Sequence, residues 1–512
     1  MKAPSKWLVA ALVTAGMFIA FLDTTIVDIT LPKMMSTLEA DMYDAQWIII
    51  SYFMGAAVAM TFVGWLGEVL GHRDTYLSGL LLFVGMSALC GAASSLEAML
   101  VSRFFQGVAE GMLIPVGWLL LSDAFPEQER GLAMGVYGVG AAFAPAVGPS
   151  LGGLITEQLT WRWIFYVNVP IGLLDAILVI WLLGNRRAPR RLPLDVVGVL
   201  LLSVALSSLV VFVSKGQEKG WLQSDFILQM VVVFAVSFIA FLFWEVLAPW
   251  PVIPRSIFAR REVPLALIAL GLNSMAAYGV YLLLPVFLQR LKGYTTLDSG
   301  LIMLPGSIAS AVATLLGGAM ADRLRPKIVA VVFLLAAAWA TWVFRTGYFD
   351  PRSAVVWDNL FWGFAISGAF APLSYLVFAS LREEEFPYGS MLINVTRLVA
   401  GSIGTALSTN LLTSRQNSFY DAISSRIEWG SHAGRELLES LGSWLAPLDQ
   451  QSWFDPSATS LGLETGRRLI QAVAGAEAFT ATYKHLALLL LLAAAAVLFA
   501  RNLKPQGPGP AH

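Results

Sequence analysis

Apolar runs of about 20 residues recur along the whole chain, and each run matches the length of one membrane-spanning helix. In lipid, backbone N–H and C=O groups must be satisfied within the protein, which a helix achieves along its own length. The composition agrees, since 57% of the residues are hydrophobic and 13% are charged. Soluble domains carry roughly 25% charged residues. The sequence therefore predicts an all-α polytopic membrane protein.

The hydrophobic runs predict fourteen membrane-spanning helices. We place them near residues 8–31, 45–70, 75–94, 97–122, 131–157, 163–184, 194–214, 226–247, 264–289, 298–321, 327–346, 355–381, 388–413 and 480–501. No small-residue cleavage site follows the first run, so we interpret it as a retained span. An even number of spans puts both termini on one side of the membrane.

Lysine and arginine residues in the short loops predict the orientation, because cytoplasmic loops carry an excess of them. With the N-terminus inside, the inner connections and tails hold 17 such residues and the outer short loops hold 8. Both termini are therefore expected in the cytoplasm. One outer segment, residues 414–479, is unusually long for a structureless loop. Its amphipathic stretches, Ile423–Leu445 and Leu461–Phe479, favour a folded cap or a docking surface, and a solvated cover without a partner is the alternative.

Charge and metal-binding residue types argue against several classes of function. The net charge is −1, so no overall field attracts nucleic acid. Cys90 is the single cysteine and the four histidines are scattered, so we expect neither a disulfide framework nor a metal site. We find no nucleophile and base on a shared face, and we expect a protein that is not an enzyme and uses no cofactor.

A short loop motif occurs twice at the same inner side. Both copies read glycine, three residues, an acid and then basic residues; they comprise Gly64, Glu68, Gly71 and Arg73 after the second span, and Gly318, Asp322 and Arg323 after the tenth. Repeated halves are typical of transporters, and a chance match is the alternative. We place an N-terminal six-helix half at 1–184, two inserted helices at 185–262 and a C-terminal six-helix half at 263–512. The acid beside guanidinium groups is expected to form a cytoplasmic latch.

Four polar side chains fall inside spans of the N-terminal half, where a charge costs roughly 2.5–3.5 kcal/mol on insertion scales. Asp23 lies two-thirds along the first span, and Arg103, Gln106 and Glu110 lie in the fourth. At about 100° per residue, these three share one helical face. A carboxylate balanced between burial and a nearby guanidinium can take up a proton from one side and release it to the other. The alternative is that the arginine only neutralises the glutamate.

Further polar and aromatic residues in the spans are candidates for substrate contact. Aromatic faces beside a buried carboxylate suit hydrophobic cations, although most such residues only pack against lipid or other helices. Together with Asp23, Gln106 and Glu110, the candidates are Asp28, Asn273, Tyr278, Tyr281, Asn394 and Arg397. Asp175, in the sixth span, is expected to snorkel or to cap a helix.

Proline and closely spaced glycines interrupt the fifth span. Proline removes a backbone donor and bends a helix, and small residues let two backbones approach closely. The stretch therefore predicts a bent, tightly packed helix whose key residues are Pro145, Gly148, Pro149, Gly152 and Gly153.

Several segments together resemble the major facilitator superfamily, and within it the fourteen-span drug:proton antiporters of the EmrB/QacA type. The likeness covers the first six spans closely and the second half more loosely. The matching segments are residues 22–32 (the first-helix signature around Asp23), 103–107 (the fourth-helix motif), 144–153 (the fifth-helix antiporter motif), 163–172 (the run after it) and 394–406 (the penultimate span).

The resemblance implies a major facilitator fold of two six-helix halves plus two inserted helices. It implies that Asp23 is the membrane acid and that Arg103 is linked to proton transfer. We expect Glu110 to join them in proton coupling, although the family usually has a small residue there. Glu68 in place of aspartate, and Val69 in place of a basic residue, predict a weaker first latch. Asp28 stands where asparagine is common.

We therefore expect proton-coupled efflux of hydrophobic, cationic or amphipathic drugs across a bacterial inner membrane by alternating access. An exporter of one metabolite, lipid or siderophore is the first alternative, and a non-transporting scaffold or sensor is the second. Members of the EmrB branch work with a periplasmic adaptor (EmrA-like) and an outer-membrane channel (TolC-like), and the long outer segment is compatible with such docking.

Overall fold

The computed structural model of the protein describes residues 5–40, 42–126, 129–184, 193–216, 218–382, 385–424 and 458–500. Every regular element within these ranges is a helix, which confirms the all-α membrane class. Twelve helical segments in the described ranges are long and apolar enough to cross a membrane, and α13 (Pro326–Trp342) is apolar but shorter. The count of fourteen spans stays a prediction.

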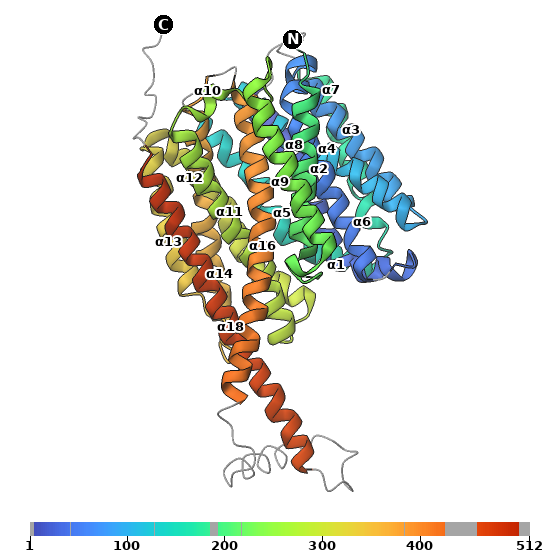
Figure 1. Cartoon of the computed structure of the whole chain (residues 1–512), viewed down its shortest axis with the longest axis vertical. Coiled ribbons are helices and arrows are strands. Elements are labelled where there is room, and N and C mark those ends of the chain that lie inside the picture. The colour runs from blue at the N-terminus through green and yellow to red at the C-terminus, as the bar shows by residue number, and fades with distance from the viewer. Residues whose placement is uncertain are drawn as a thin grey trace.

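The first seven helices pack together on one side of the molecule (Figure 1). They are α1 (Lys6–Thr37), α2 (Met42–Leu70), α3 (His72–Ala92), α4 (Leu96–Ala124), α5 (Arg130–Gln158), α6 (Trp163–Tyr166) and α7 (Asn168–Leu182). α1 contacts α4, α5 and α7, and α3 contacts α4 and α7. Both α1 and α3 therefore face α7.

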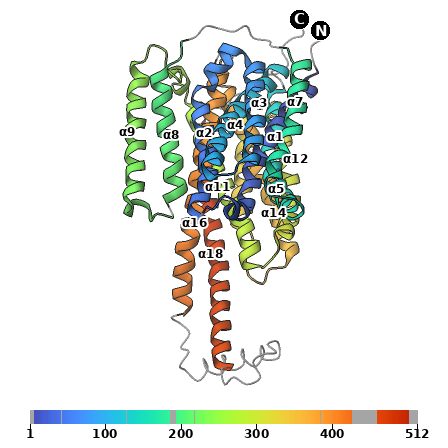
Figure 2. The same ribbon diagram turned by 90° about the vertical axis from the view of Figure 1, so that its right-hand side faces the viewer.

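Two further helices, α8 (Val196–Gly216) and α9 (Asp225–Leu247), stand at the edge of the bundle (Figure 2). The short turn η2 (Trp221–Gln223) lies between them. α8 packs against α2 and α9 contacts α8. The ammonium of Lys215, near the end of α8, donates to Gln46 Oε1 of α2 at 2.8 Å and joins the pair to the bundle.

The remaining helices form the other side of the bundle (Figure 1). They are α10 (Arg255–Phe258), α11 (Glu262–Val286), η3 (Phe287–Leu291), α12 (Thr296–Arg323), α13, α14 (Arg352–Gly368), α15 (Phe370–Phe378), α16 (Phe386–Ser424) and α18 (Ala458–Leu498). α5 packs along α12, and α2 and α8 contact α16, so these contacts join the two sides. The domain limits drawn at 184 and 262 stay predictions.

Two of the expected spans, the sixth and the twelfth, are each divided into two helices. The sixth breaks between α6 and α7, and the twelfth breaks between α14 and α15. Pro170 and Pro372 explain both breaks, because a proline ring clashes with the carbonyl group four positions earlier. Those carbonyl groups belong to Tyr166, the last residue of α6, and Gly368, the last residue of α14.

α16 and α18 continue side by side beyond the rest of the bundle (Figures 1 and 2). The sequence assigned residues 414–479 to an outer segment, but α16 runs on to Ser424 and α18 begins at Ala458. Hydropathy detects only the apolar part of a long helix, and residues 409–424 contain no proline or glycine to end it. The stretch expected at Ile423–Leu445 lies almost wholly outside the described residues.

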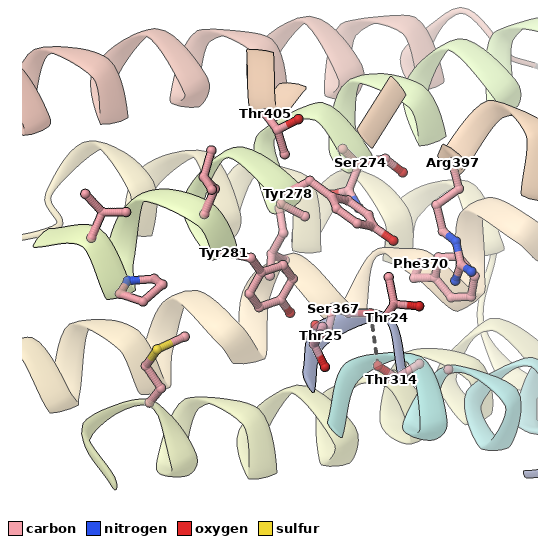
Figure 3. A pocket seen from close by; sticks show the side chains of 18 of the residues that line it. Thr24, Thr25, Ser274, Tyr278, Tyr281, Thr314, Ser367, Phe370, Arg397 and Thr405 are labelled. Carbon is pink, nitrogen blue, oxygen red and sulfur yellow. Dashed lines mark hydrogen bonds between the residues drawn. The ribbon is translucent and has the colours of Figure 1, made fainter. Parts of the chain in front are cut away.

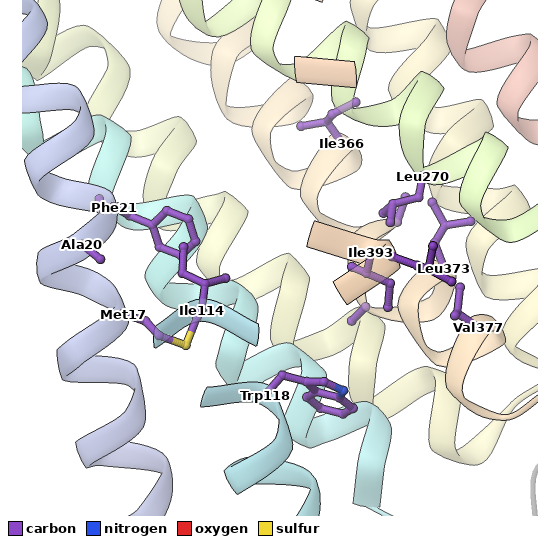
Figure 4. Packing of buried hydrophobic residues seen from close by; sticks show 14 of the residues in the cluster. Met17, Ala20, Phe21, Ile114, Trp118, Leu270, Ile366, Leu373, Val377 and Ile393 are labelled. Atoms are coloured by element: carbon purple, nitrogen blue, oxygen red, sulfur yellow. The ribbon is translucent and has the colours of Figure 1, made fainter. Parts of the chain in front are cut away.

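The two sides meet tightly near the end of the bundle where α1 begins and α18 ends, which we call the terminal end. Apolar side chains of α1 and α4 face those of α11, α14, α15 and α16 (Figure 4). The rings of Trp118 and Phe378 lie 4.6 Å apart between centroids, and Ser390 Oγ donates to the Pro115 carbonyl at 2.9 Å. These contacts close the bundle at the terminal end.

Asp322, at the end of α12, joins the two sides at the same place. Its carboxylate accepts hydrogen bonds from the backbone N–H groups of Gly131 (2.7 Å) and Leu132 (2.8 Å), in the first turn of α5. Free N–H groups and the helix dipole favour a carboxylate at a helix N-terminus. The expected latch residue therefore binds a helix N-terminus, and Arg323 also interacts with it electrostatically. Gly318 permits the approach, because a Cβ there would lie 1.9 Å from the Gly131 carbonyl oxygen.

Replacing Asp322 with alanine should loosen the terminal end. Loss of a side chain that satisfies helix N-terminal N–H groups costs about 1 kcal/mol, which shifts the open-to-closed ratio about fivefold. Electron–electron distances between spin labels at residues 129 and 325, in a Cys90→Ser background, should gain a longer component. Asp298→Ala, in the first turn of the same helix at its other end, is the control. An unchanged distance distribution for Asp322→Ala would refute the latch.

Candidate functional site

A buried network of polar side chains surrounds Asp23 of α1. Its Oδ2 forms an ion pair with Arg103 of α4 at 2.5 Å, and its Oδ1 accepts hydrogen bonds from Gln106 of α4 and Asn168 of α7, both at 3.0 Å. Ser87 Oγ of α3 accepts from Asn168 at 3.1 Å and from Gln106 at 3.3 Å. The side chains of Asp23 and Arg103 are 0% and 1% exposed. Four helices thus contribute to one enclosed polar centre.

The contacts of Arg103 compensate for its removal from water. Burying a charge costs several kcal/mol, so a buried ion pair needs good geometry and further hydrogen bonds. Arg103 donates from Nη1 to Gln106 Oε1 at 2.8 Å and from Nε to the Ile48 carbonyl at 3.2 Å. Its guanidinium carbon also lies 4.0 Å from the ring centroid of Tyr52. Protonation of Asp23 would therefore leave Arg103 without its main counter-ion.

Close packing of α2 against α4 brings these groups together. A Cβ on Gly107 of α4 would lie 1.9 Å from the carbonyl oxygen of Tyr52, and one on Gly55 of α2 would lie 1.9 Å from that of Phe104. Small residues let membrane helices approach in this way. The contact of Arg103 with α2 therefore depends on these two glycines.

Glu110, two turns beyond Arg103 on α4, is buried with 6% of its surface exposed. Its carboxylate interacts electrostatically with Arg397 of α16 as well as with Asp23 and Arg103. Glu110 thus connects the network around Asp23 to a helix of the other side.

A cavity of about 400 Å³ lies between the two sides of the bundle (Figure 3). Thr24 and Thr25, which follow Asp23 on α1, line it together with Tyr281 of α11. Arg397 points toward Thr24 and Phe370 (Figure 3), and it is the charged residue among the described lining residues. A mostly apolar enclosure with a few polar groups is typical of small-molecule sites.

The predicted substrate contacts fall into two groups. The first group lines the cavity and comprises Asn273, Tyr278, Tyr281 and Arg397. The second group is buried without lining it and comprises Asp23, Gln106, Glu110 and Asn394. The side chain of Asp28 lies outside the described residues. The cavity and the residues expected to couple protons are therefore adjacent but distinct.

The glycines of the fifth-span motif lie against α1 in two of three cases. A Cβ on Gly148 would lie 2.1 Å from Thr25 Oγ1, and one on Gly152 would lie 2.6 Å from Ile26 Cγ1. A Cβ on Gly153 would meet nothing within 4 Å. The close approach therefore places α5 directly against a residue of the cavity wall.

The same motif does not divide α5, which is one helix across Pro145 and Pro149. The side chains of these two prolines lie outside the described residues. The first loop motif lies at the terminal end, where a Cβ on Gly64 would be 3.7 Å from Pro387 Cβ of α16. Glu68 interacts electrostatically with Tyr388 there. Gly71 has a φ of 85°, which a residue with a side chain rarely adopts.

Three residues of the network around Asp23 had no role predicted from the sequence: Ser87, Tyr52 and Asn168. The available signal was an uncharged polar group within an apolar span. That signal is weak, because such groups often bond to their own helix, as Thr30 does to the Val27 carbonyl at 3.0 Å. Only the packing of α2, α3, α4 and α7 around this part of α1 shows which of them face an acid.

A two-sided bundle of apolar helices, with a cavity between its sides and a buried ion pair beside that cavity, defines a membrane transporter. A family model of the Major Facilitator Superfamily matches residues 13–405. The chain belongs to the major facilitator superfamily, as the sequence motifs predicted.

Relatives and solved structures agree with this family. The chain is 30% identical to multidrug export protein EmrB of Escherichia coli K12 over 454 residues, 87% of this chain and 88% of that protein. It is 29% identical to fatty acid resistance protein FarB of Neisseria gonorrhoeae over 417 residues, 81% and 82% of the two chains. The structure of the proton:xylose symporter XylE superimposes with a TM-score of 0.60 at 14% identity, covering 98% of this chain and 97% of that one. This last likeness concerns the fold alone.

Removing one charge of the buried pair should destabilise the protein more than removing both. Asp23→Asn leaves Arg103 without its counter-ion, and breaking a buried pair costs about 3–5 kcal/mol. Asp23→Asn with Arg103→Gln removes both charges and should restore part of the loss. Thermal unfolding midpoints in detergent measure the difference. Arg352→Gln, which breaks the exposed pair with Asp298, is the control and should shift the midpoint little. A double variant no more stable than Asp23→Asn would contradict this account.

Gly148→Leu should stall transport while the protein remains folded. A side chain there would push against Thr25 and hold α5 away from α1. Gly153→Leu is the matched control, because its site is open. Substrate transport in vesicles and the size-exclusion profile of each variant provide the comparison. Equal transport by both variants would show that the close approach at Gly148 has no part in the cycle.

Proposed function

We propose that this protein exports hydrophobic, cationic or amphipathic drugs in exchange for protons. The observation that carries the proposal is the buried pair of Asp23 and Arg103. The two residues that follow Asp23 on α1, Thr24 and Thr25, line the cavity. A single helix, α1, therefore contributes to both the acid site and the space for a substrate. The similarity to multidrug export protein EmrB and fatty acid resistance protein FarB supports export as the direction.

In the proposed cycle, Asp23 carries the proton. When it is ionised, the ion pair with Arg103 and the hydrogen bonds from Gln106 and Asn168 hold α1 against α4 and α7. Protonation cancels the negative charge and turns Arg103 toward the remaining acid, Glu110. The resulting shift of α1 changes the cavity wall. Proton and substrate thus affect each other through α1, without competing for the same atoms.

The lining of the cavity supports a preference for apolar and amphipathic compounds. Tyr278, Tyr281 and Phe370 offer aromatic faces to a hydrophobic ligand. Behind the wall, the acids Asp23 and Glu110 favour a cation, whereas Arg397 in the wall opposes one. A bulky compound with a delocalised charge satisfies these opposing fields better than a small ion does.

Alternating access then follows from movement of the two sides about the α5–α12 and α2–α16 contacts. The terminal end is closed by Asp322 and by the rings of Trp118 and Phe378. The cavity instead extends toward the opposite end, where Gln289 and Ser299 line it. With the termini in the cytoplasm, this conformation faces outward.

We place the protein in a bacterial inner membrane with both termini cytoplasmic, on the distribution of lysine and arginine in its loops. The paired extension of α16 and α18 then stands outside the membrane. A helical extension of this kind offers a surface for a periplasmic adaptor (EmrA-like) that leads to an outer-membrane channel (TolC-like).

Asp23→Asn should abolish proton-driven efflux, because the amide cannot exchange a proton. Everted vesicles that carry the variant should accumulate ethidium at the background rate under an imposed pH gradient. Asp225→Asn, at the exposed start of α9, is the control and should transport like the unchanged protein. Accumulation should be scaled to the amount of folded protein. Undiminished accumulation by Asp23→Asn would refute the role of this acid.

A further inference from the structure

We propose that Asp175 of α7 is a second proton-binding carboxyl group, which receives the proton from Asp23 on its way to the terminal end. The proposal rests on the proton coupling proposed for Asp23. Asp175 is 4% exposed and lines neither the cavity nor the network around Asp23. The sequence predicted that it would snorkel or cap a helix, but its side chain faces α1 and α3.

The immediate surroundings of Asp175 are nearly closed. The hydroxyl of Tyr76 on α3 lies 3.3 Å from Asp175 Oδ2, and 3.4 Å from the carbonyl oxygens of Leu12 and Val13 on α1. The single hydroxyl proton of Tyr76 therefore has three candidate acceptors and can be donated fully to only one of them. Asp175 Oδ1 is buried without a hydrogen-bond partner. The backbone of α1 seals the site at Gly16, where a Cβ would lie 2.0 Å from the Tyr76 hydroxyl oxygen.

No positive charge compensates for Asp175 within the part of the chain that the structure describes. From α1 and α3, the titratable group that faces it is the Tyr76 hydroxyl. Arg73 reaches α7 but donates to the Ile180 carbonyl at 3.0 Å, five residues or about 8 Å of helix further on. An isolated ionised carboxylate is far costlier to bury than a neutral carboxylic acid. Asp175 is therefore placed to hold a proton, whereas Asp23 is placed beside Arg103 to hold a charge.

The two carboxyl groups are aligned along neighbouring antiparallel helices. Asp23 and Gly16 are seven residues apart on α1, and Asn168 and Asp175 are seven residues apart on α7. Seven residues are two helical turns, about 10 Å. Asn168 contacts Asp23, and Gly16 adjoins Asp175. Asp175 therefore lies about two turns closer to the terminal end than Asp23.

Titratable groups continue from Asp175 toward the terminal end. His72 lies one turn before Tyr76 on α3, and its Nδ1 is 2.8 Å from Asp123 Oδ2 of α4. The other ring nitrogen, Nε2, is buried without a hydrogen-bond partner. The pair of His72 and Asp123 thus stands between Asp175 and the end of the bundle.

An apolar layer separates the two carboxyl groups in this conformation. At that level, a Cβ on Gly172 of α7 would lie 2.4 Å from Val84 and 3.5 Å from Ile19. In the proposed step, Asp175 first releases its proton to water at the terminal end, and the proton of the Asp23 carboxyl group then binds the Asp175 carboxylate. The layer blocks this step while the terminal end is closed. Water that enters when that end opens completes the route.

The test compares two assays on proteoliposomes, with ethidium as the transported dye. The first measures uptake driven by a pH gradient, and the second measures dye exchange without a gradient. Asp175→Asn should lower the driven uptake at least tenfold and leave exchange within twofold of the unchanged protein. Asp175→Glu should recover part of the driven uptake, because it restores a group that binds a proton. Tyr76→Phe, which keeps the ring, is the second variant should Asp175→Asn fail to fold, and it should slow driven uptake selectively.

Infrared difference spectroscopy adds a readout that does not depend on transport. The unchanged protein should show a protonated carboxyl band that is missing in Asp175→Asn and present in Asp175→Glu. Driven uptake retained by Asp175→Asn but lost by Asp23→Asn would overturn the relay alone. Loss of exchange together with driven uptake would assign Asp175 a structural role and also overturn it. Exchange without any driven uptake in the unchanged protein would overturn the proposed proton coupling, and the relay with it.

Discussion

The ion pair between Asp23 and Arg103 fixes how the helices of the N-terminal side are arranged. Two charges removed from water are tolerated only if every remaining donor and acceptor finds a partner. This requirement draws Asn168 of α7 and Gln106 of α4 to the same oxygen of Asp23, and it draws Arg103 to the backbone of α2. The same requirement explains the glycines at the contact between α2 and α4, Gly55 and Gly107. A bulkier residue at either position would hold Arg103 away from α2.

α1 links the ion pair to the cavity and to α5. Around its circumference, Asp23 faces α4 and α7, Thr24 and Thr25 face the cavity, and Thr25 also meets Gly148 of α5. α5 in turn holds the far side of the bundle through the bond between its first turn and Asp322. A change at Asp23 therefore reaches both the substrate space and the contact between the two sides through one rigid helix. No separate pathway of mobile side chains is needed.

The features most predictable from the sequence were charged residues within apolar spans, which are rare. Charges inside apolar spans are costly enough to stand out, so Asp23 and Arg103 were found directly, whereas Asn168 and Ser87 were not. The breaks at Pro170 and Pro372 have a local steric cause, yet a hydropathy window averages over them. The separation of the cavity from the acid network was out of reach, because it depends on which face of α1 each of three successive residues occupies. The binding of Asp322 to the N-terminus of α5 was also not predicted, because every residue other than proline has a backbone N–H group and no sequence pattern distinguishes the ones that bind.

The proposed exchange requires that protons do not pass without substrate, and the closed terminal end meets that requirement. Its barrier is the packing of Trp118, Phe378 and the first turn of α5, which keeps water from that end of the bundle. Asp23 lies beyond this barrier, and the apolar residues beside Gly172 separate it from Asp175. A proton on Asp23 therefore has no polar route to the terminal end in this conformation. Because the movement that opens the terminal end must break the bond of Asp322 to α5, proton release and exposure of the cavity to that end would be one event in the proposed cycle.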